Sequence, residues 1–268
     1  MTRGMASTRT STPKPVELIK VLVGPAGSSQ PFILPRRQLE FYSPFLRHII
    51  ERITLSDTIC LQLDDPAAFE ILVNWMSWDT ESPTCHQSAG KLQAKLRSEE
   101  DDGIMLAFKV WMLTHRLGGP CLVLRDECMR FLYEEHTAPM LGHNAREITP
   151  ATALYVFESI SSASELNNFV VAVLARVKRP WSSVDPGGAW DDVFEQVPEL
   201  KTLVDAMWGL PREARIRQLQ RMEKYMCTPG EVTPDWWQKQ TVGGRTRKYA
   251  GSYVVAQRFA YIRISLNS

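Results

Sequence analysis

Two neighbouring carboxylates, Asp64 and Asp65, are the first residues in the chain whose types and spacing could support acid–base chemistry. A pair of carboxylates can act together, one as a general acid and the other as a general base. Here the pair directly precedes Pro66, and an acidic residue before proline is a common arrangement at the start of a helix. We therefore interpret the pair as a helix cap and not as a catalytic dyad.

His115, Cys121 and Cys128 are metal-binding residue types that lie close together in the sequence. The five residues between the first two and the six between the last two match no recognised zinc spacing. The glycines at 118 and 119 also predict a helix break between the histidine and the cysteines. We therefore expect these side chains in the core and no metal site.

The cysteines of the chain are scattered and include no C-x-x-C pair; they are Cys60, Cys85, Cys121, Cys128 and Cys227. Three of them, Cys60, Cys121 and Cys128, have apolar neighbours and are expected to be reduced core residues. Reduced cysteines favour a cytoplasmic or nuclear location.

No other segment has the pattern of an enzyme or cofactor site. Gly24 and Gly27 lack the Gly-Lys-Ser/Thr of a phosphate loop and the third glycine of a dinucleotide fingerprint, so we interpret them as part of a turn. No nucleophile has a recognisable base with an orienting acid, and no His-Glu-x-x-His motif is present. The sequence predicts a protein that is not an enzyme and that has no cofactor or metal.

Composition allows a sizeable core and argues against a membrane protein. Of the 268 residues 44% are hydrophobic, yet no apolar run approaches the ~20 residues that cross a bilayer. The net charge of +1 hides basic ends: nine basic residues lie in 1–14 and 236–268, which contain no acidic residue. The remainder holds 22 basic and 30 acidic residues, about −8, which argues against a nucleic-acid-binding body.

Three short strands are predicted near the N-terminus. Residues 16–23 form an apolar run that ends in a Gly-Pro turn, and residues 30–34 complete a hairpin with it. A third run, residues 58–63, alternates between apolar and polar side chains. Together with the helices predicted below, this small sheet indicates an α+β fold.

Several helices are predicted to begin at a proline that follows a capping residue. Ser43-Pro44 and Asp65-Pro66 begin two of them, and a short helix precedes the first, starting at Pro35. The helix after Asp65 carries Phe69, Leu72, Val73 and Met76 on one face, with Trp75 one position away. Further helices are expected over 104–117, from 120 to about 135, from 149 onward, over 166–177, over 191–208 with an interruption at Pro198, and from 211 to about 225, the last largely solvated.

The region between these groups of helices, residues 79–103, is polar and contains Pro83 and Gly90. We expect a variable surface loop there, with at most a short solvated helix from Lys91 to Arg97. The two ends of the chain, residues 1–14 and 228–268, are expected to be disordered or flexible tails. Trp236-Trp237 in the second tail would either anchor a partner or fold back onto the domain.

The order of these elements resembles the BTB (POZ) family in its divergent fungal form. That family has a strand ending in Val-Gly, then a Phe-x-x-His-Lys-x-x-Leu-x-x-x-Ser-x-Phe-Phe segment. This chain has Phe32, Leu39 and Ser43 in the matching places, with Pro35 instead of the histidine and Arg36 instead of the lysine. The segments 59–70 and 108–122 are similar to later motifs of the family, and the resemblance covers roughly residues 16–177.

The resemblance implies a BTB-like domain over residues 15–140, with the variable loop 79–103, and an α-helical extension over 141–227. It implies a protein–protein interaction module that self-associates or acts as an adaptor. A physical argument points the same way, because the run from Val16 to Val23 holds more apolar side chains than one face of a small hairpin can bury. A homodimer would cover the rest, and so would the helical extension at 148–208. The expected interaction surface contains Leu18, Phe41, Tyr42, Leu55 and Asp57.

Two alternatives stay open at this stage. Many relatives in the family are substrate adaptors of a cullin-type ubiquitin ligase and carry an apolar-x-Glu motif before the third strand, which Leu55-Ser56-Asp57 approximates. The second alternative is a transcription regulator that uses its basic tail, which contains Arg245 to Lys248. These four residues are too few to indicate nucleic-acid binding.

Overall fold

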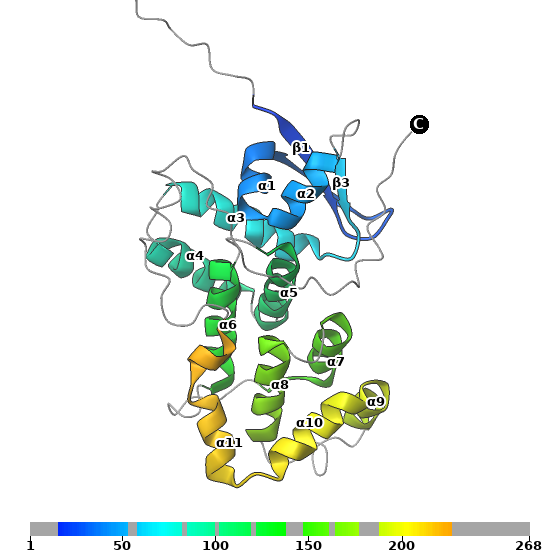
Figure 1. Ribbon diagram of the computed structural model, residues 1–268, viewed down its shortest axis with the longest axis vertical. Helices are drawn as coiled ribbons and strands as arrows, with labels where there is room; N and C mark the ends of the chain where they lie inside the picture. Colours follow the sequence, from blue (N-terminus) through cyan, green and yellow to red (C-terminus); the bar gives the residue numbers. More distant parts are fainter. Residues whose placement is uncertain are drawn as a thin grey trace, which may run out of the picture.

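A computed structural model describes residues 16–52, 58–81, 85–99, 102–118, 122–137, 147–160, 164–176 and 188–226. The fold is α+β, as expected, with a small sheet at one end and a helical assembly at the other (Figure 1). The strands are β1 (Leu18–Val23), β2 (Gln30–Pro35) and β3 (Thr58–Leu61). The first helices are α1 (Arg36–Tyr42), α2 (Pro44–Arg52), α3 (Pro66–Glu81), α4 (Cys85–Ser98), α5 (Asp102–Leu117) and α6 (Leu122–Thr137). The rest are α7 (Pro150–Ser159), α8 (Glu165–Arg176), α9 (Ala189–Gln196), α10 (Pro198–Trp208), α11 (Arg212–Leu219) and a 3₁₀ helix, Met222–Tyr225.

The sheet has the strand order β2-β1-β3. β1 and β2 form the predicted antiparallel hairpin, in which Val21 lies opposite Phe32, and β3 runs parallel to β1 with Ile59 beside Val21. Gly24, at the end of β1, has a φ of +106°, a backbone conformation that suits glycine and lets the chain turn back. Its N–H donates to the carbonyl of Leu61, which ties the turn to the end of β3.

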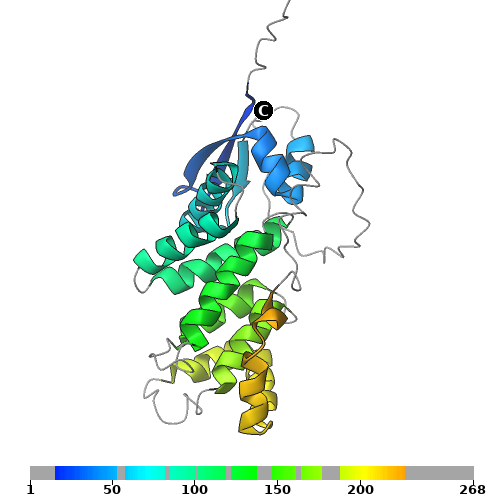
Figure 2. The ribbon, with the colours of Figure 1, turned by 90° about the vertical axis from the view of Figure 1, so that its left-hand side faces the viewer.

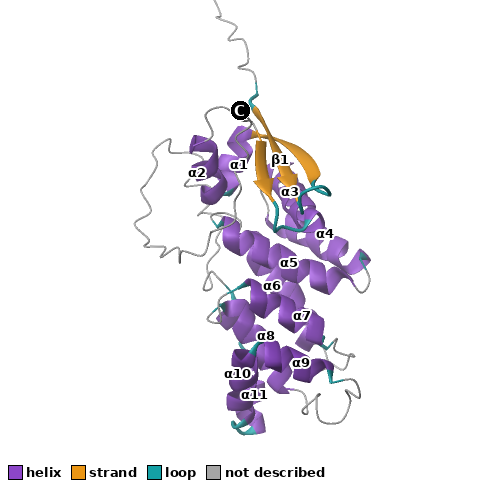
Figure 3. Ribbon diagram, turned by 90° about the vertical axis from the view of Figure 1, so that its right-hand side faces the viewer, coloured by secondary structure: helices purple, strands orange, loops and turns teal. Residues whose placement is uncertain are grey.

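One face of the sheet is covered by α3. Ile19, Val21 and Val23 of β1 are buried on this face, and the ring of Phe32 meets that of Phe69 on α3 edge-on, with 4.9 Å between centroids. Figures 2 and 3 view the sheet from its two sides: α3 lies in front of the strands in Figure 2, whereas the strands face the viewer in Figure 3. Described residues therefore pack against one face of the sheet and leave the other face open.

The capping residues of the N-terminal helices act as predicted. The Ser43 hydroxyl accepts a hydrogen bond from the Leu46 N–H at 3.0 Å and donates one to the Leu117 carbonyl at 2.9 Å. Ser43 thus both begins α2 and holds it against the end of α5. The Asp65 carboxylate accepts from the N–H groups of Ala67 and Ala68, at 2.8 and 3.2 Å, at the start of α3.

The prediction of a polar loop over residues 79–103 was wrong for most of that segment. α3 continues to Glu81 and α4 spans Cys85–Ser98, with Leu92 and Leu96 fully buried. The two leucines lie four residues apart and therefore share one face of the helix, which packs into the core while the polar side chains face outward. The few apolar residues of this segment were thus enough to anchor a helix.

The described part of the extension consists of packed helices. The Thr149 hydroxyl caps α7 by accepting from the Thr152 N–H at 3.1 Å, and the Ser164 hydroxyl accepts from the Asn167 N–H at 3.1 Å at the start of α8. The expected interruption at Pro198 is present, because α9 ends at Gln196 and α10 begins at Pro198. The segment predicted as a largely solvated charged helix is exposed or half-buried apart from Arg215, Leu219 and Tyr225, which are buried. α11 ends at Leu219, earlier than predicted.

Two smaller expectations about the third strand also need correction. β3 ends at Leu61, and Leu63 lies in the following turn with 73% of its surface exposed. Cys60 is half-buried and not a core residue, because Ile59 and Leu61 point inward and the residue between them points to the other face.

None of the described helices combines the length and the apolar character that a membrane span needs.

Candidate interaction surface

Exposed apolar side chains lie together on the outer face of the sheet. Leu18 of β1 is 52% exposed and Ile33 of β2 is 66% exposed. Val16, just before β1, is 69% exposed. Isolated apolar side chains at a surface are common, but neighbouring ones on one sheet face are a recognised mark of an interaction site.

The strand register places these side chains next to each other. Leu18 pairs with Pro35, and Lys20 pairs with Ile33, so Leu18 and Ile33 are diagonal neighbours on one face. Diagonal neighbours of this kind lie ~7–8 Å apart, within reach of each other for long side chains. The next row contains Pro31, half-buried Leu22 and half-buried Cys60. The outer face is therefore apolar apart from Lys20 and Thr58, and we call these residues together the outer sheet face.

Ion pairs hold the backbone at the border of this surface. The Arg36 N–H donates to the Glu17 carbonyl at 2.9 Å, and the Arg36 guanidinium pairs with the carboxylates of Glu40 at 2.8 Å and Glu17 at 3.2 Å. The bond with Glu40 is the main cause of the raised pKa of the Arg36 guanidinium. These contacts join the residue before Leu18 to the start of α1, so that Leu18 is presented on an ordered backbone.

Of the predicted surface residues, Leu18 lies at this surface. Tyr42 instead belongs to the core with 4% of its surface exposed, and Phe41 is partly buried against the core with its ring 5.0 Å from that of Tyr42. α1 turns these rings inward because it packs on α2 directly after β2. Leu55 and Asp57 lie outside the described residues.

Sequence reasoning missed Ile33 and Lys20 as members of the surface. The prediction placed a strand over 30–34 but did not assign its faces. Pairing Val21 with Phe32 would have placed Lys20 and Ile33 on the outer face, since residues one position away from a buried pair point to the opposite side.

The two aspartates singled out in the sequence have structural partners, in agreement with the capping interpretation. Asp65 caps α3 with one carboxylate oxygen and accepts from the Lys109 Nζ of α5 at 2.6 Å with the other. Burial alone would raise the pKa of Asp65, but Lys109 and the two capping N–H groups outweigh it and hold that pKa below its usual range. Asp64 is buried and forms an ion pair with Arg116, also on α5.

The other chemistry-bearing residues are separated. Cys128 is fully buried, and burial raises the pKa of its thiol well above the ordinary value. His115 stacks on Trp111, with 5.1 Å between ring centroids, and its Nδ1 lies 2.8 Å from the Arg125 guanidinium. Cys121 lies outside the described residues. Within the part of the chain that the structure describes, no three His, Cys, Asp or Glu side chains are arranged to hold a metal ion.

Comparison with known proteins identified no relative: no family model, curated protein or solved structure matches this chain.

Proposed function

We propose that this chain is a BTB-like protein–protein interaction module that self-associates through the outer sheet face. The observation that carries the proposal is the exposure of Leu18 and Ile33 side by side on an ordered sheet. Burying apolar surface contributes roughly 25 cal/mol per Å², so covering this face with a second protein surface would contribute favourably to association.

The sequence left two ways to cover these side chains, a second molecule or the helical extension. The exposure of Leu18 and Ile33 is measured with the described extension in place. The extension, from α7 to α11, lies at the opposite end of the molecule from the sheet (Figure 1). The described helices of the extension therefore leave the surface open, which favours a partner molecule.

The element order supports the BTB-like part of the proposal. A β-hairpin, two short helices, a third strand parallel to the first and a helix beginning after Asp64-Asp65 follow one another as the resemblance implies. The proposal includes no catalysis, no cofactor and no metal. A cytoplasmic or nuclear location belongs to it as well, since Cys60 and Cys128 are free thiols.

Self-association is tested by light scattering and sedimentation at tens of micromolar protein. The expected mass is twice the 30.5 kDa of one chain. Leu18→Asp is expected to give a folded monomer, because a carboxylate on this face would have to be buried in the interface. Leu210→Asp is the matched control, since Leu210 is also an exposed leucine but lies after α10.

Removal of residues 229–268 is expected to leave the mass unchanged. A monomeric wild-type protein, or loss of the dimer in both leucine variants, would refute the proposal. Circular dichroism of each variant separates loss of association from loss of folding.

A further inference from the structure

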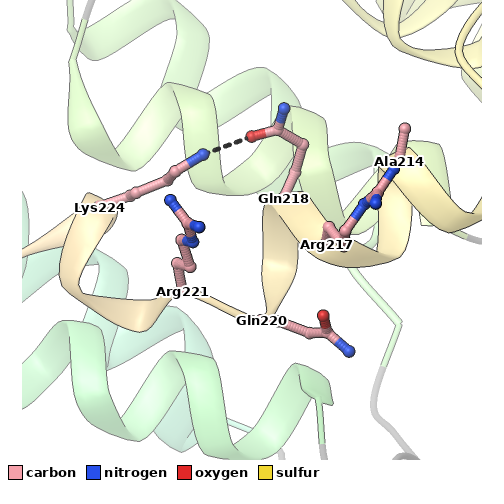
Figure 4. A pocket seen from close by; sticks show the side chains of 6 residues that line it. All are labelled: Ala214, Arg217, Gln218, Gln220, Arg221 and Lys224. Carbon is pink, nitrogen blue, oxygen red and sulfur yellow. Dashed lines mark hydrogen bonds between the residues drawn. The ribbon is translucent and has the colours of Figure 1, made fainter.

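A second feature, far from the sheet, is a basic hollow between α11 and the 3₁₀ helix that follows it. It is lined by Ala214, Arg217, Gln218, Gln220, Arg221 and Lys224, and its volume is about 320 Å³ (Figure 4). This is at the lower end of the volumes of small-molecule sites, which are roughly 300–1,000 Å³. Every charged side chain that lines it is a cation.

The cations that line the hollow form no ion pair with a described carboxylate. This holds for the guanidinium groups of Arg217 and Arg221. Lys224 donates from Nζ to the Gln218 Oε1 at 2.7 Å, and this neutral oxygen leaves the lysine charge in place. Figure 4 shows Arg221 and Lys224 pointing into the same space beside Gln218, whereas Arg217 lies along α11 toward Ala214.

The backbone around the hollow is anchored in the core. Leu219 and Tyr225, which flank it, are buried, and the Tyr225 hydroxyl donates to the Gln218 carbonyl at 3.0 Å. The Tyr133 hydroxyl of α6 donates to the Leu219 carbonyl, and the ring of Phe169 on α8 meets that of Tyr225 edge-on at 5.4 Å. The backbone of the turn between α11 and the 3₁₀ helix is thus fixed from two sides, and this turn carries Arg221 and Lys224 to the same hollow.

We propose that this hollow binds a phosphoryl group, with Arg221 and Lys224 as its main ligands. A guanidinium presents parallel N–H donors that match the oxygens of a phosphate, and a lysine adds a point charge and further donors. A phosphoryl group between the two side chains would relieve the repulsion that they now exert on each other. The group belongs to a free phosphate compound or to a phosphorylated peptide, which share this chemistry.

The probe for the first source is inorganic pyrophosphate, titrated into the full chain by isothermal calorimetry at low ionic strength, where exposed charges are least screened. One binding site per chain is expected. The double variant Arg221→Gln, Lys224→Gln should bind at least about tenfold more weakly, because it removes two charge-assisted interactions.

The matched control is the double variant Arg37→Gln, Arg212→Gln. It removes the same net charge from exposed arginines that do not line the hollow, and its affinity should stay within about twofold. Equal weakening in both double variants, binding of many ions per chain, or no binding to the wild-type protein would overturn the proposal.

A phosphoserine peptide and its unphosphorylated form are the probes for the second source. Preference for the phosphorylated peptide over pyrophosphate, lost in the Arg221, Lys224 variant, identifies a protein ligand. The reverse preference identifies a small phosphate compound. Either result supports a phosphoryl site, and binding of the two peptides with equal affinity contradicts a peptide ligand. These results are independent of oligomeric state, because the hollow lies at the end of the molecule opposite the sheet (Figure 1).

Discussion

The sheet-bearing region, residues 16–137, and the helical extension, residues 147–226, treat their apolar side chains differently. Among the described residues, the large exposed apolar side chains of the first region are Val16, Leu18, Ile33 and Leu63, whereas the second region has Leu210. A sheet has two faces, and α3 covers one of them. Each helix has one apolar stripe, and neighbouring helices of the extension bury it. Among the described residues, the exposed apolar side chains that lie together, Leu18 and Ile33, are therefore a consequence of the one-sided sheet.

The same difference separates the two proposed surfaces by their chemistry. The outer sheet face is apolar with a single charged side chain, Lys20, and suits a protein partner. The hollow beside α11 is lined by cations and amides and suits an anion. Three stability measurements test whether the side chains that are buried in the structure stabilise the fold more than the exposed ones do.

The largest effect is expected for α4, the helix of the sheet-bearing region that was predicted as a loop from the sequence. Leu92→Ala and Leu96→Ala should each cost ~2–5 kcal/mol of the free energy of unfolding, and the double variant up to roughly 10 kcal/mol, because the effects of neighbouring sites need not add. That is comparable with the whole stability of an ordinary domain, ~5–15 kcal/mol, so the double variant should fold poorly. Urea unfolding followed by tryptophan fluorescence measures it.

The control for α4 is Lys95→Ala, which removes an exposed ion pair with Glu99 and should change stability by less than about 1 kcal/mol. A double leucine variant that loses less than about 1 kcal/mol would show that the segment behaves as a surface loop. α4 would then contribute nothing to the core of the first region.

An intermediate effect is expected at Leu72, on the face of α3 that belongs to the core. Leu72 is 1% exposed, and Leu72→Ala should cost ~2–5 kcal/mol. Leu63→Ala removes the same atoms from an exposed leucine nine residues earlier and should stay within about 0.5 kcal/mol. Equal values for the two variants in urea unfolding would contradict the separation of packed and open surfaces in this region.

The smallest effect is expected at the junction of α3 with α5, where Asp65 accepts from Lys109. Because the pKa of Asp65 is lowered in the folded state, its carboxylate stabilises the fold above the unfolded pKa of about 3.9. Asp65→Asn should therefore lower the free energy of unfolding by ~1–2 kcal/mol near pH 7. The difference from wild type should shrink as the pH falls through the unfolded pKa toward the lower folded one.

Urea titrations at several pH values between about 3 and 7 check this dependence. Glu158→Gln is the control, because Glu158 is exposed near the end of α7 and should give a small and nearly constant difference. A deficit in Asp65→Asn that stays constant down to the lowest pH would mean that the carboxylate charge does not contribute.

Local signals in the sequence predicted much of the fold. The hairpin, the caps at Ser43 and Asp65, the helix start at 149 and the interruption at Pro198 appear where expected. The α4 helix was missed because its composition is polar, and its two core leucines show their role only when a neighbouring layer is present. Of the candidate surface, Leu18 was identified, but Tyr42 was assigned to the surface and is buried.

What the sequence determined by itself is the set of local choices: where strands and helices begin, which side chains cap them and where the chain turns. These depend on backbone geometry and on hydrogen bonds between residues a few positions apart, so a short window of sequence contains their cause. Only the tertiary structure decided which face of the sheet is covered, that Asp64 and Asp65 both pair with α5, and that Arg221 and Lys224 share one space. Those outcomes depend on contacts between distant segments, whose register and packing no local pattern specifies.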